Sequence, residues 1–169
     1  VDLRLLETTA KSLPDVNFVL VGPAQVNIES LSRIPNVHIL GIRPHQTLPS
    51  YIKRFDVGLI PYKLTEYTAN VYPTKLNEYL AMGVPVVATD LSEIRRFNAD
   101  HSDIINIATD ADAFRHSIES SLTEVGEEAK DRRISVAQQN SWPAKIRDMS
   151  GLIQNFLKSR EKQSKGWEK

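Results

Sequence analysis

The chain has 169 residues, of which 41% are hydrophobic, enough for one well-filled core. Lysine plus arginine and aspartate plus glutamate both number 21, so no overall charge favours nucleic acid or an acidic partner. The absence of cysteine excludes disulfides and thiolate metal sites and fits a reducing compartment. The apolar runs are far shorter than the roughly 20 residues that span a bilayer. These totals predict a soluble, cytoplasmic domain that binds its ligand at a local site.

The first part of the chain alternates between helical and extended patterns. Apolar residues at 3, 6, 10 and 13 recur at helical spacing, and later short β-branched runs end at glycine or proline. The expected elements are a helix over 2–13, a strand over 17–22, a short helix over 27–33, a strand over 37–40, a helical stretch over 48–55 and a strand over 56–62.

The same alternation continues to the C-terminus. After a loop over 63–72, we expect a helix over 73–82, a strand over 84–90, a short helix over 91–97, a strand over 103–109 and helices over 111–122 and 127–139. Five apolar residues at steps of four and three then predict a long amphipathic helix: Trp142, Ile146, Met149, Ile153 and Phe156. The polar residues that follow are expected to fray.

Five short apolar strands separated by helices predict an α/β fold, a Rossmann-like, doubly wound parallel sheet with helices on both faces. The predicted domain covers 1–157, and 158–169 form a polar tail. A doubly wound unit normally opens with a central strand, whereas this chain opens with a helix. We therefore expect that the first strand of the sheet is missing.

The stretch YPTKLNEY, residues 72–79, carries the main candidate site. It follows a strand, and open parallel sheets bind ligands at the carboxyl ends of their strands. Pro73 suits the first helical position, and Thr74 with Lys75 offers a hydroxyl and an ammonium to a diphosphate. Glu78 could accept both hydroxyls of a ribose 2′,3′-diol. The alternative is an exposed Lys75–Glu78 surface pair.

Three segments together resemble the C-terminal, donor-binding domain of GT-B-fold nucleotide-sugar glycosyltransferases. They are DLRLLETTAKSLPDVNFVLVGP, IPNVHILGIRPHQTLPSYIKRFDVGLIPY and YPTKLNEYLAMGVPVVATDLSEI, and the resemblance covers roughly residues 1–157. It implies one half of a GT-B fold, in which Glu78 holds the donor ribose. The remaining implied substrate-binding residues are the diphosphate-binding turn (Val71, Tyr72, Pro73, Thr74 and Lys75), the base-binding loop (Gly41, Ile42 and Arg43) and Gly22-Pro23 at the inter-domain cleft.

One position departs from the family pattern. Many members carry a second glutamate eight residues before the ribose-binding one, and this chain has Asn70 there. Asn70 is expected to touch the donor sugar by hydrogen bonding. The residues Pro73, Lys75, Glu78 and Tyr79 form the pattern P-x-K-x-x-E-Y, which points to a particular branch of the family.

The resemblance implies sugar transfer from a nucleotide diphosphate sugar to an acceptor in polysaccharide or glycoconjugate synthesis. No cofactor or metal is required by this interpretation. The expected partners are the nucleotide-sugar donor and an absent N-terminal domain that binds the acceptor and supplies the catalytic base, with no nucleic acid. The full-length protein could contact the inner face of the membrane. The alternatives are a nucleotide-sugar epimerase of the same fold and a non-catalytic Rossmann-like binding module.

Other motifs favour structural roles. Asp110-Ala111-Asp112 spells a metal-binding D-x-D, but it follows a strand and begins a helix, so Asp110 is expected to be an N-cap. The four histidines show no metal spacing, and only His45 lies near the expected base-binding loop. The doublets at 95–96 and 132–133 are expected on solvated helix faces.

Overall fold

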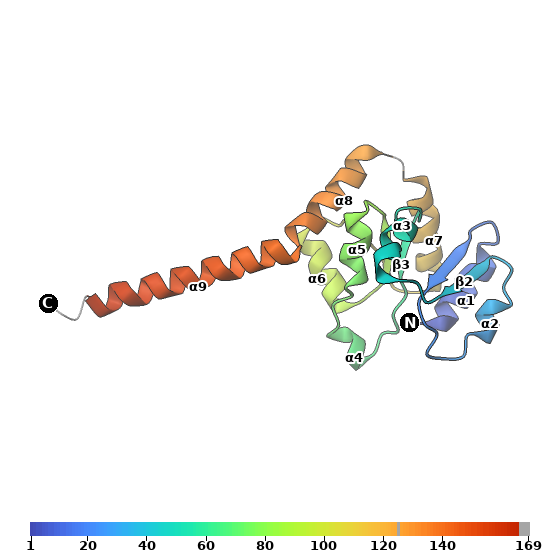
Figure 1. The fold of residues 1–169 in the computed structure, drawn as a ribbon. Coiled ribbons are helices and arrows are strands. Elements are labelled where there is room, and N and C mark those ends of the chain that lie inside the picture. The colour runs from blue at the N-terminus through green and yellow to red at the C-terminus, as the bar shows by residue number, and fades with distance from the viewer. Residues whose placement is uncertain (125, 166–169) are drawn as a thin grey trace.

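The computed structural model describes residues 1–124 and 126–165, which alternate between helices and short strands (Figure 1). All five strands expected from the sequence are present. In chain order the elements are α1 (Leu3–Ser12), β1 (Phe18–Val21), α2 (Glu29–Ser32), β2 (Val37–Gly41), the 3-10 helix η1 (His45–Thr47), α3 (Leu48–Ile52), β3 (Gly58–Ile60), α4 (Glu66–Ala69), α5 (Lys75–Ala81), β4 (Val86–Thr89), α6 (Ser92–Asp100), β5 (Asn106–Ala108), α7 (Ala111–Thr123), α8 (Glu127–Gln139) and α9 (Trp142–Lys165).

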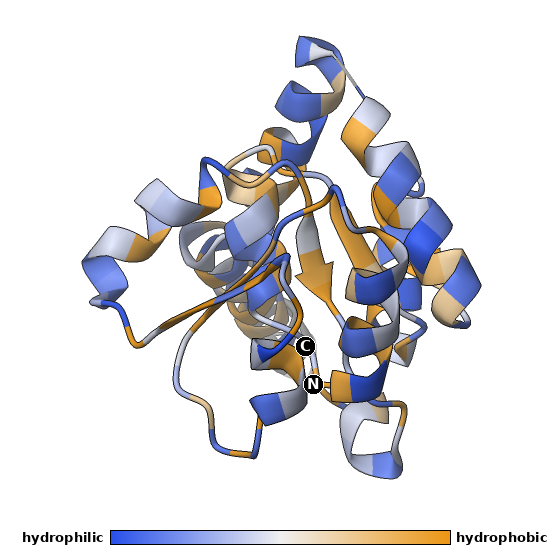
Figure 2. Ribbon diagram, turned by 90° about the vertical axis from the view of Figure 1, so that its right-hand side faces the viewer, coloured by the Kyte–Doolittle hydropathy of each residue, from blue (hydrophilic) through white to orange (hydrophobic). Residues whose placement is uncertain are grey.

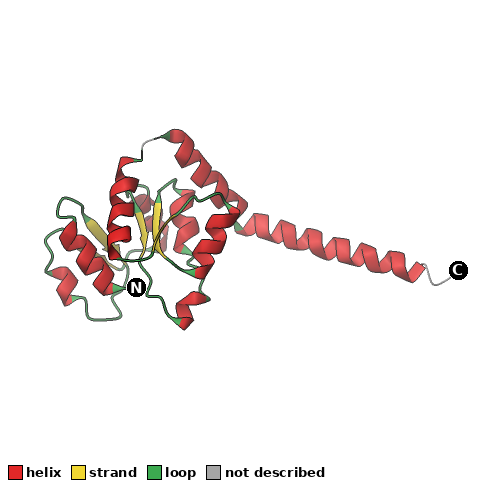
Figure 3. Cartoon of the chain, turned by 180° about the vertical axis from the view of Figure 1, so that it is seen from behind, coloured by secondary structure: helices red, strands yellow, loops and turns green. Residues whose placement is uncertain are grey.

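The strands form two parallel ladders (Figure 3). In one ladder β1 pairs with β2, and in the other β3, β4 and β5 pair in that order. Within the described residues no strand pairing joins the two ladders. Parallel strands flanked by helices confirm the predicted α/β, Rossmann-like class.

Helices cover both faces of the β3-β4-β5 ladder, and β4 shows why. Successive side chains of a strand point to opposite faces. Val87 belongs to the core cluster that contains Leu6 of α1 and Phe114 of α7. Val86 and Ala88 belong to a second cluster, formed with α5, α6 and α8. Figure 2 shows mainly hydrophobic strands among helices in which hydrophilic and hydrophobic residues alternate.

A buried asparagine fixes α1 to the start of β2. The Nδ2 group of Asn36 lies 3.0, 2.9 and 2.8 Å from the carbonyls of Ala10, Leu13 and Val16, so its two hydrogens are shared among three acceptors. Ala10 lies in the last turn of α1, where carbonyls have no partner within the helix, so the contact with Asn36 satisfies a carbonyl that burial would otherwise leave unpaired.

A buried arginine fixes α8 to the end of α5. Arg133 Nε donates to the Gly83 carbonyl at 2.8 Å, and Nη1 pairs with the Glu124 carboxylate at 2.9 Å. Only 7% of the Arg133 side chain is exposed. The expectation of a solvated basic doublet is therefore wrong for Arg133, because a backbone carbonyl and a carboxylate compensate its burial.

Two segments differ from the expected elements. The loop predicted over 63–72 contains the short helix α4. Thr65 caps the N-terminus of this helix, because its side chain accepts a hydrogen bond from the Thr68 amide at 3.2 Å. Helix α9 continues through the first part of the expected polar tail to Lys165, and residues 166–169 lie outside the described residues. Figures 1 and 3 show α9 projecting away from the rest of the fold.

The close contact between β3 and α5 gives a stability prediction. A Cβ atom built on Gly58 would lie 2.6 Å from the Tyr79 ring, so Gly58→Ala must displace a packed aromatic side chain. We expect a loss of about 1–3 kcal/mol in the free energy of unfolding, measured by urea denaturation. Gly151→Ala is the control, because a Cβ there meets no atom beyond its own helix within 4 Å and alanine favours a helix more than glycine does, so no stability should be lost. Equal stability of Gly58→Ala and the unsubstituted chain would contradict the packing of Tyr79 on β3.

Candidate functional site

The candidate site begins at the turn that leads into α5. Pro73 is fully buried, and Leu76 and Leu80 anchor the inner face of the helix in the core. Thr74 is the N-cap residue with helical backbone angles, and its side chain makes no capping hydrogen bond. Thr74 and Lys75 are therefore exposed on a turn that the buried residues hold in place.

Lys75 and Glu78 form the exposed ion pair that the sequence offered as the alternative to a donor-binding role. Lys75 Nζ lies 3.1 and 2.9 Å from the two carboxylate oxygens of Glu78. The exposed fractions of the two side chains are 49% and 34%. A pair this exposed contributes only about 0–1 kcal/mol, so a bound anion could displace the carboxylate from Lys75 at little cost.

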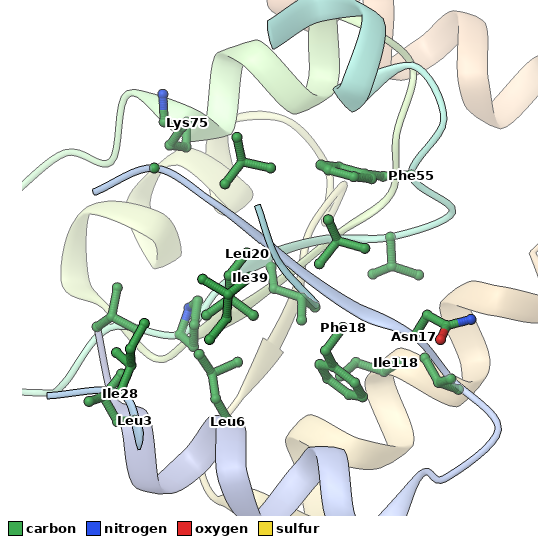
Figure 4. Close-up of a pocket in the computed structure, with 18 of the residues that line it drawn as sticks. Leu3, Leu6, Asn17, Phe18, Leu20, Ile28, Ile39, Phe55, Lys75 and Ile118 are labelled. Atoms are coloured by element: carbon green, nitrogen blue, oxygen red, sulfur yellow. The ribbon is translucent and has the colours of Figure 1, made fainter. Parts of the chain in front are cut away.

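A cavity of about 840 Å³ lies beside this pair (Figure 4). Gly22 and Pro23 line it at the carboxyl end of β1, and Tyr62, Lys75 and Tyr79 line it beyond β3. Lys75 is thus shared between the ion pair and the cavity. Glu78 contacts Lys75 and is not among the described residues that line the cavity.

Thr89 holds Tyr62, which lines the cavity just after β3. Its hydroxyl donates to the Tyr62 carbonyl at 2.8 Å and accepts from the Tyr62 amide at 3.1 Å. Thr89 is buried at the end of β4, so it ties the chain after β3 to the neighbouring strand. Neither Thr89 nor Tyr62 was predicted from the sequence, because no local pattern shows that residues 27 positions apart meet.

Tyr79 is held neutral at the inner side of the site. Burial raises the pKa of Tyr79 to about 12, and the Glu78 carboxylate and Tyr62 add to the effect. Burial also raises the pKa of Tyr72, although the neighbouring Asn77 side chain opposes this. Both phenols therefore remain protonated at neutral pH and can donate hydrogen bonds.

The other predicted residues lie outside the cavity lining. Arg43 donates from Nε to the Tyr51 hydroxyl at 3.1 Å and from Nη1 to the Ile42 carbonyl at 3.0 Å, while the Ile42 side chain is exposed. Asn70 ends α4 and donates to the Glu66 carbonyl at 3.3 Å. The structure thus brings Lys75 together with Glu78 and with the cavity that Gly22 lines, whereas Ile42, Arg43 and Asn70 remain separate from it. The predicted turn residues Val71, Tyr72, Pro73 and Thr74 connect Asn70 to Lys75 and are not among the lining residues.

The aspartates and histidines considered for metal binding either have structural roles or do not cluster with other possible ligands. Asp110 caps α7 by accepting from the Ala113 amide at 2.8 Å, which confirms its predicted role. Over 1–124 and 126–165, no group of three or more His, Cys, Asp or Glu side chains is placed to hold a metal ion. His45 is exposed in η1.

In the same described ranges, no helix is both long and apolar enough to cross a bilayer.

The geometry defines an α/β domain of the kind that binds ligands at the carboxyl ends of parallel strands. The family described as Glycosyl transferases group 1 matches residues 3–124, and the chain belongs to this family as a GT-B-like glycosyltransferase domain. A relative from Bacillus subtilis (strain 168), which carries the name putative teichuronic acid biosynthesis glycosyltransferase TuaH, is 30% identical over 153 residues. That alignment covers 88% of this chain and 38% of the relative, so the chain spans well under half of the relative's length.

The raised pKa of Tyr79 predicts a loss of stability at high pH. The ordinary pKa of tyrosine is near 10, and that of folded Tyr79 is about 12. Between these values the unfolded state releases the proton that the folded state retains, so the free energy of unfolding falls as the pH rises. One such proton contributes a slope of at most about 1.4 kcal/mol per pH unit.

Tyr79→Phe should remove this contribution, whereas Tyr67→Phe, at a tyrosine that is 80% exposed, should leave it unchanged. Denaturant unfolding at several pH values between 10 and 12 measures the slopes. The same slope in Tyr79→Phe and the unsubstituted chain would show that this phenol is not buried as described.

Proposed function

We propose that this chain is the nucleotide-sugar-binding half of a glycosyltransferase that acts in the synthesis of a polysaccharide or glycoconjugate. Membership of the glycosyltransferase family supports the reaction class, and the name of the Bacillus subtilis relative supports the class of product. The observation that carries the assignment is the position of Lys75. It lines the cavity at the carboxyl ends of the strands and pairs with the Glu78 carboxylate.

In the proposed complex, Lys75 exchanges its partner when the donor binds. Its ammonium turns to the diphosphate, and the turn from Val71 to Thr74 contributes main-chain and hydroxyl groups. Glu78, released from Lys75, accepts the two ribose hydroxyls. The loop containing Ile42 and Arg43 meets the base through its main chain, Asn70 touches the sugar, and Gly22 lets the chain approach the donor closely.

The proposed chemical contribution of this half is stabilisation of the leaving group. As the glycosidic bond breaks, negative charge grows on the departing nucleoside diphosphate. A lysine ammonium supplies positive charge to these oxygens without a metal ion. Residues that act on the acceptor, including a catalytic base, are assigned to a separate N-terminal domain.

Helix α9 supports the presence of a partner domain. Trp142, Ile146, Met149, Ile153 and Phe156 follow one another at steps of four and three, and all of these side chains are more than half exposed. A contiguous apolar stripe on a projecting helix is typical of a surface that another protein segment covers. We assign it to the acceptor-binding domain of the same protein.

The first functional prediction concerns Glu78. In the full-length protein, Glu78→Ala should weaken nucleoside diphosphate binding by about 1.5–3 kcal/mol, the range for hydrogen bonds to a charged group. Isothermal titration with UDP, GDP and ADP measures the change and identifies the preferred base.

The matched control is Glu127→Ala, because Glu127 forms an exposed i,i+3 pair with Lys130 on α8, where the spacing is the same. Its affinity should equal that of the unsubstituted protein. Equal affinity in Glu78→Ala would remove Glu78 from the donor site.

The second prediction separates Lys75 from Glu78. Lys75→Met should weaken binding of the preferred nucleoside diphosphate by about 1.5–3 kcal/mol and leave binding of the corresponding nucleoside nearly unchanged, because only the diphosphate carries the charge that Lys75 contacts. Glu78→Ala should weaken both ligands, since both contain the ribose diol. Equal losses for diphosphate and nucleoside in Lys75→Met would contradict the proposed division of roles.

A further inference from the structure

The Tyr72 side chain packs into the core, although its backbone belongs to the turn proposed to hold the diphosphate. Its ring centroid lies 6.1 Å from that of Phe97 in α6, with the two rings tilted by 54°. The ring also packs against the core cluster that contains Leu76 and Leu80 of α5. Tyr72 therefore connects the turn to both helices, and any displacement of the turn moves its phenol relative to α5 and α6.

Two polar atoms at this place are buried without a partner. Within 1–124 and 126–165, neither the Tyr72 hydroxyl nor Oδ1 of Asn77 has a hydrogen-bond partner. Folded proteins pair the great majority of their buried polar atoms, so each unpaired atom requires a physical explanation. The phenol is a donor and the amide oxygen is an acceptor, so each atom has what the other lacks.

The side chains of Tyr72 and Asn77 are also neighbours. Burial raises the pKa of Tyr72, the Asn77 side chain on α5 opposes this rise, and the Glu93 carboxylate in the first turn of α6 adds to it. A side chain affects the pKa of another group in this way only when it lies close to it. A small reorientation of Tyr72 and Asn77 would therefore bring the phenol proton to the amide oxygen.

The chain that leads into this turn is weakly held. The Val71 amide lies 3.2 Å from the Thr68 carbonyl. The Asn70 amide lies 3.4 Å from the Tyr67 carbonyl. Both distances exceed the usual separation of about 2.9–3.0 Å for such hydrogen bonds. The part of the turn that carries Tyr72 can therefore shift slightly without the loss of a strong hydrogen bond.

We propose that Tyr72 is a positioning residue whose hydroxyl donates to Asn77 when a nucleoside diphosphate is bound at the turn. This inference rests on the proposed role of residues 71–74 in holding the diphosphate. In the free protein, two unpaired buried atoms raise the free energy of the observed arrangement. An anion that draws the turn toward Lys75 moves the phenol with it, and one hydrogen bond then satisfies both atoms. The pair favours the bound arrangement of the turn without contacting the ligand.

The test uses Tyr72→Phe in the full-length protein and measures stability and binding separately. Without nucleotide, the midpoint of urea unfolding should be unchanged or higher, because the substitution removes an unpaired hydroxyl. Binding of the preferred nucleoside diphosphate among UDP, GDP and ADP should weaken by about three- to tenfold, because the bound form loses a hydrogen bond. Tyr67→Phe, at a tyrosine that is 80% exposed, is the control and should change neither quantity. A lower urea midpoint for Tyr72→Phe would show that its hydroxyl is already paired in the free protein and would overturn the proposal.

A second variant identifies the acceptor. Asn77→Leu should weaken diphosphate binding as much as Tyr72→Phe, and the double variant should lose no more than either single variant, because all three lack the same hydrogen bond. Binding of the corresponding nucleoside should remain nearly unchanged, since it has no diphosphate to move the turn. A loss of affinity in Tyr72→Phe but not in Asn77→Leu would overturn the pairing and assign the acceptor to Glu93.

The same titrations separate this inference from the proposed function. If Lys75→Met weakens diphosphate binding and Tyr72→Phe does not, the pairing is overturned and the diphosphate site remains. If the unsubstituted full-length protein binds none of the three nucleoside diphosphates, both the pairing and the proposed function are overturned.

Discussion

The burial of β4 on both faces is the constraint on which the rest of the structure depends. All four residues from Val86 to Thr89 are buried, with Val87 in one core cluster and Val86 and Ala88 in the other. Helices must therefore cover both sides of the strand. The ends of β4 are equally fixed, because Gly83 before it accepts from Arg133 and Thr89 at its end binds Tyr62.

The geometry of the candidate site depends on this packing. Leu76 and Leu80 bury one side of α5, and Tyr79 fits against β3 because Gly58 has no Cβ. Lys75 and Glu78 are thereby directed outward next to the carboxyl ends of the strands. Their exposed ion pair adds little to stability, so it does not hold the site together. A weakly held ammonium on a rigid support suits a group that must change partners when an anionic ligand arrives.

The sequence predicted the features that depend on nearby residues. The strands appear as short apolar runs because burial on both faces requires apolar side chains throughout. The contact between Lys75 and Glu78 follows from a spacing of three residues on a helix. Asp110 was identified as an N-cap because the acceptor and the amide it satisfies are only three residues apart.

Features that depend on distant residues were missed. The burial of Arg133 requires the Gly83 carbonyl, which lies 50 positions earlier in the chain. The four-residue helix α4 is too short for an amphipathic repeat and depends on the capping contact between Thr65 and Thr68. The division of the strands into two ladders was also missed, because pairing between strands joins residues that lie far apart in the chain.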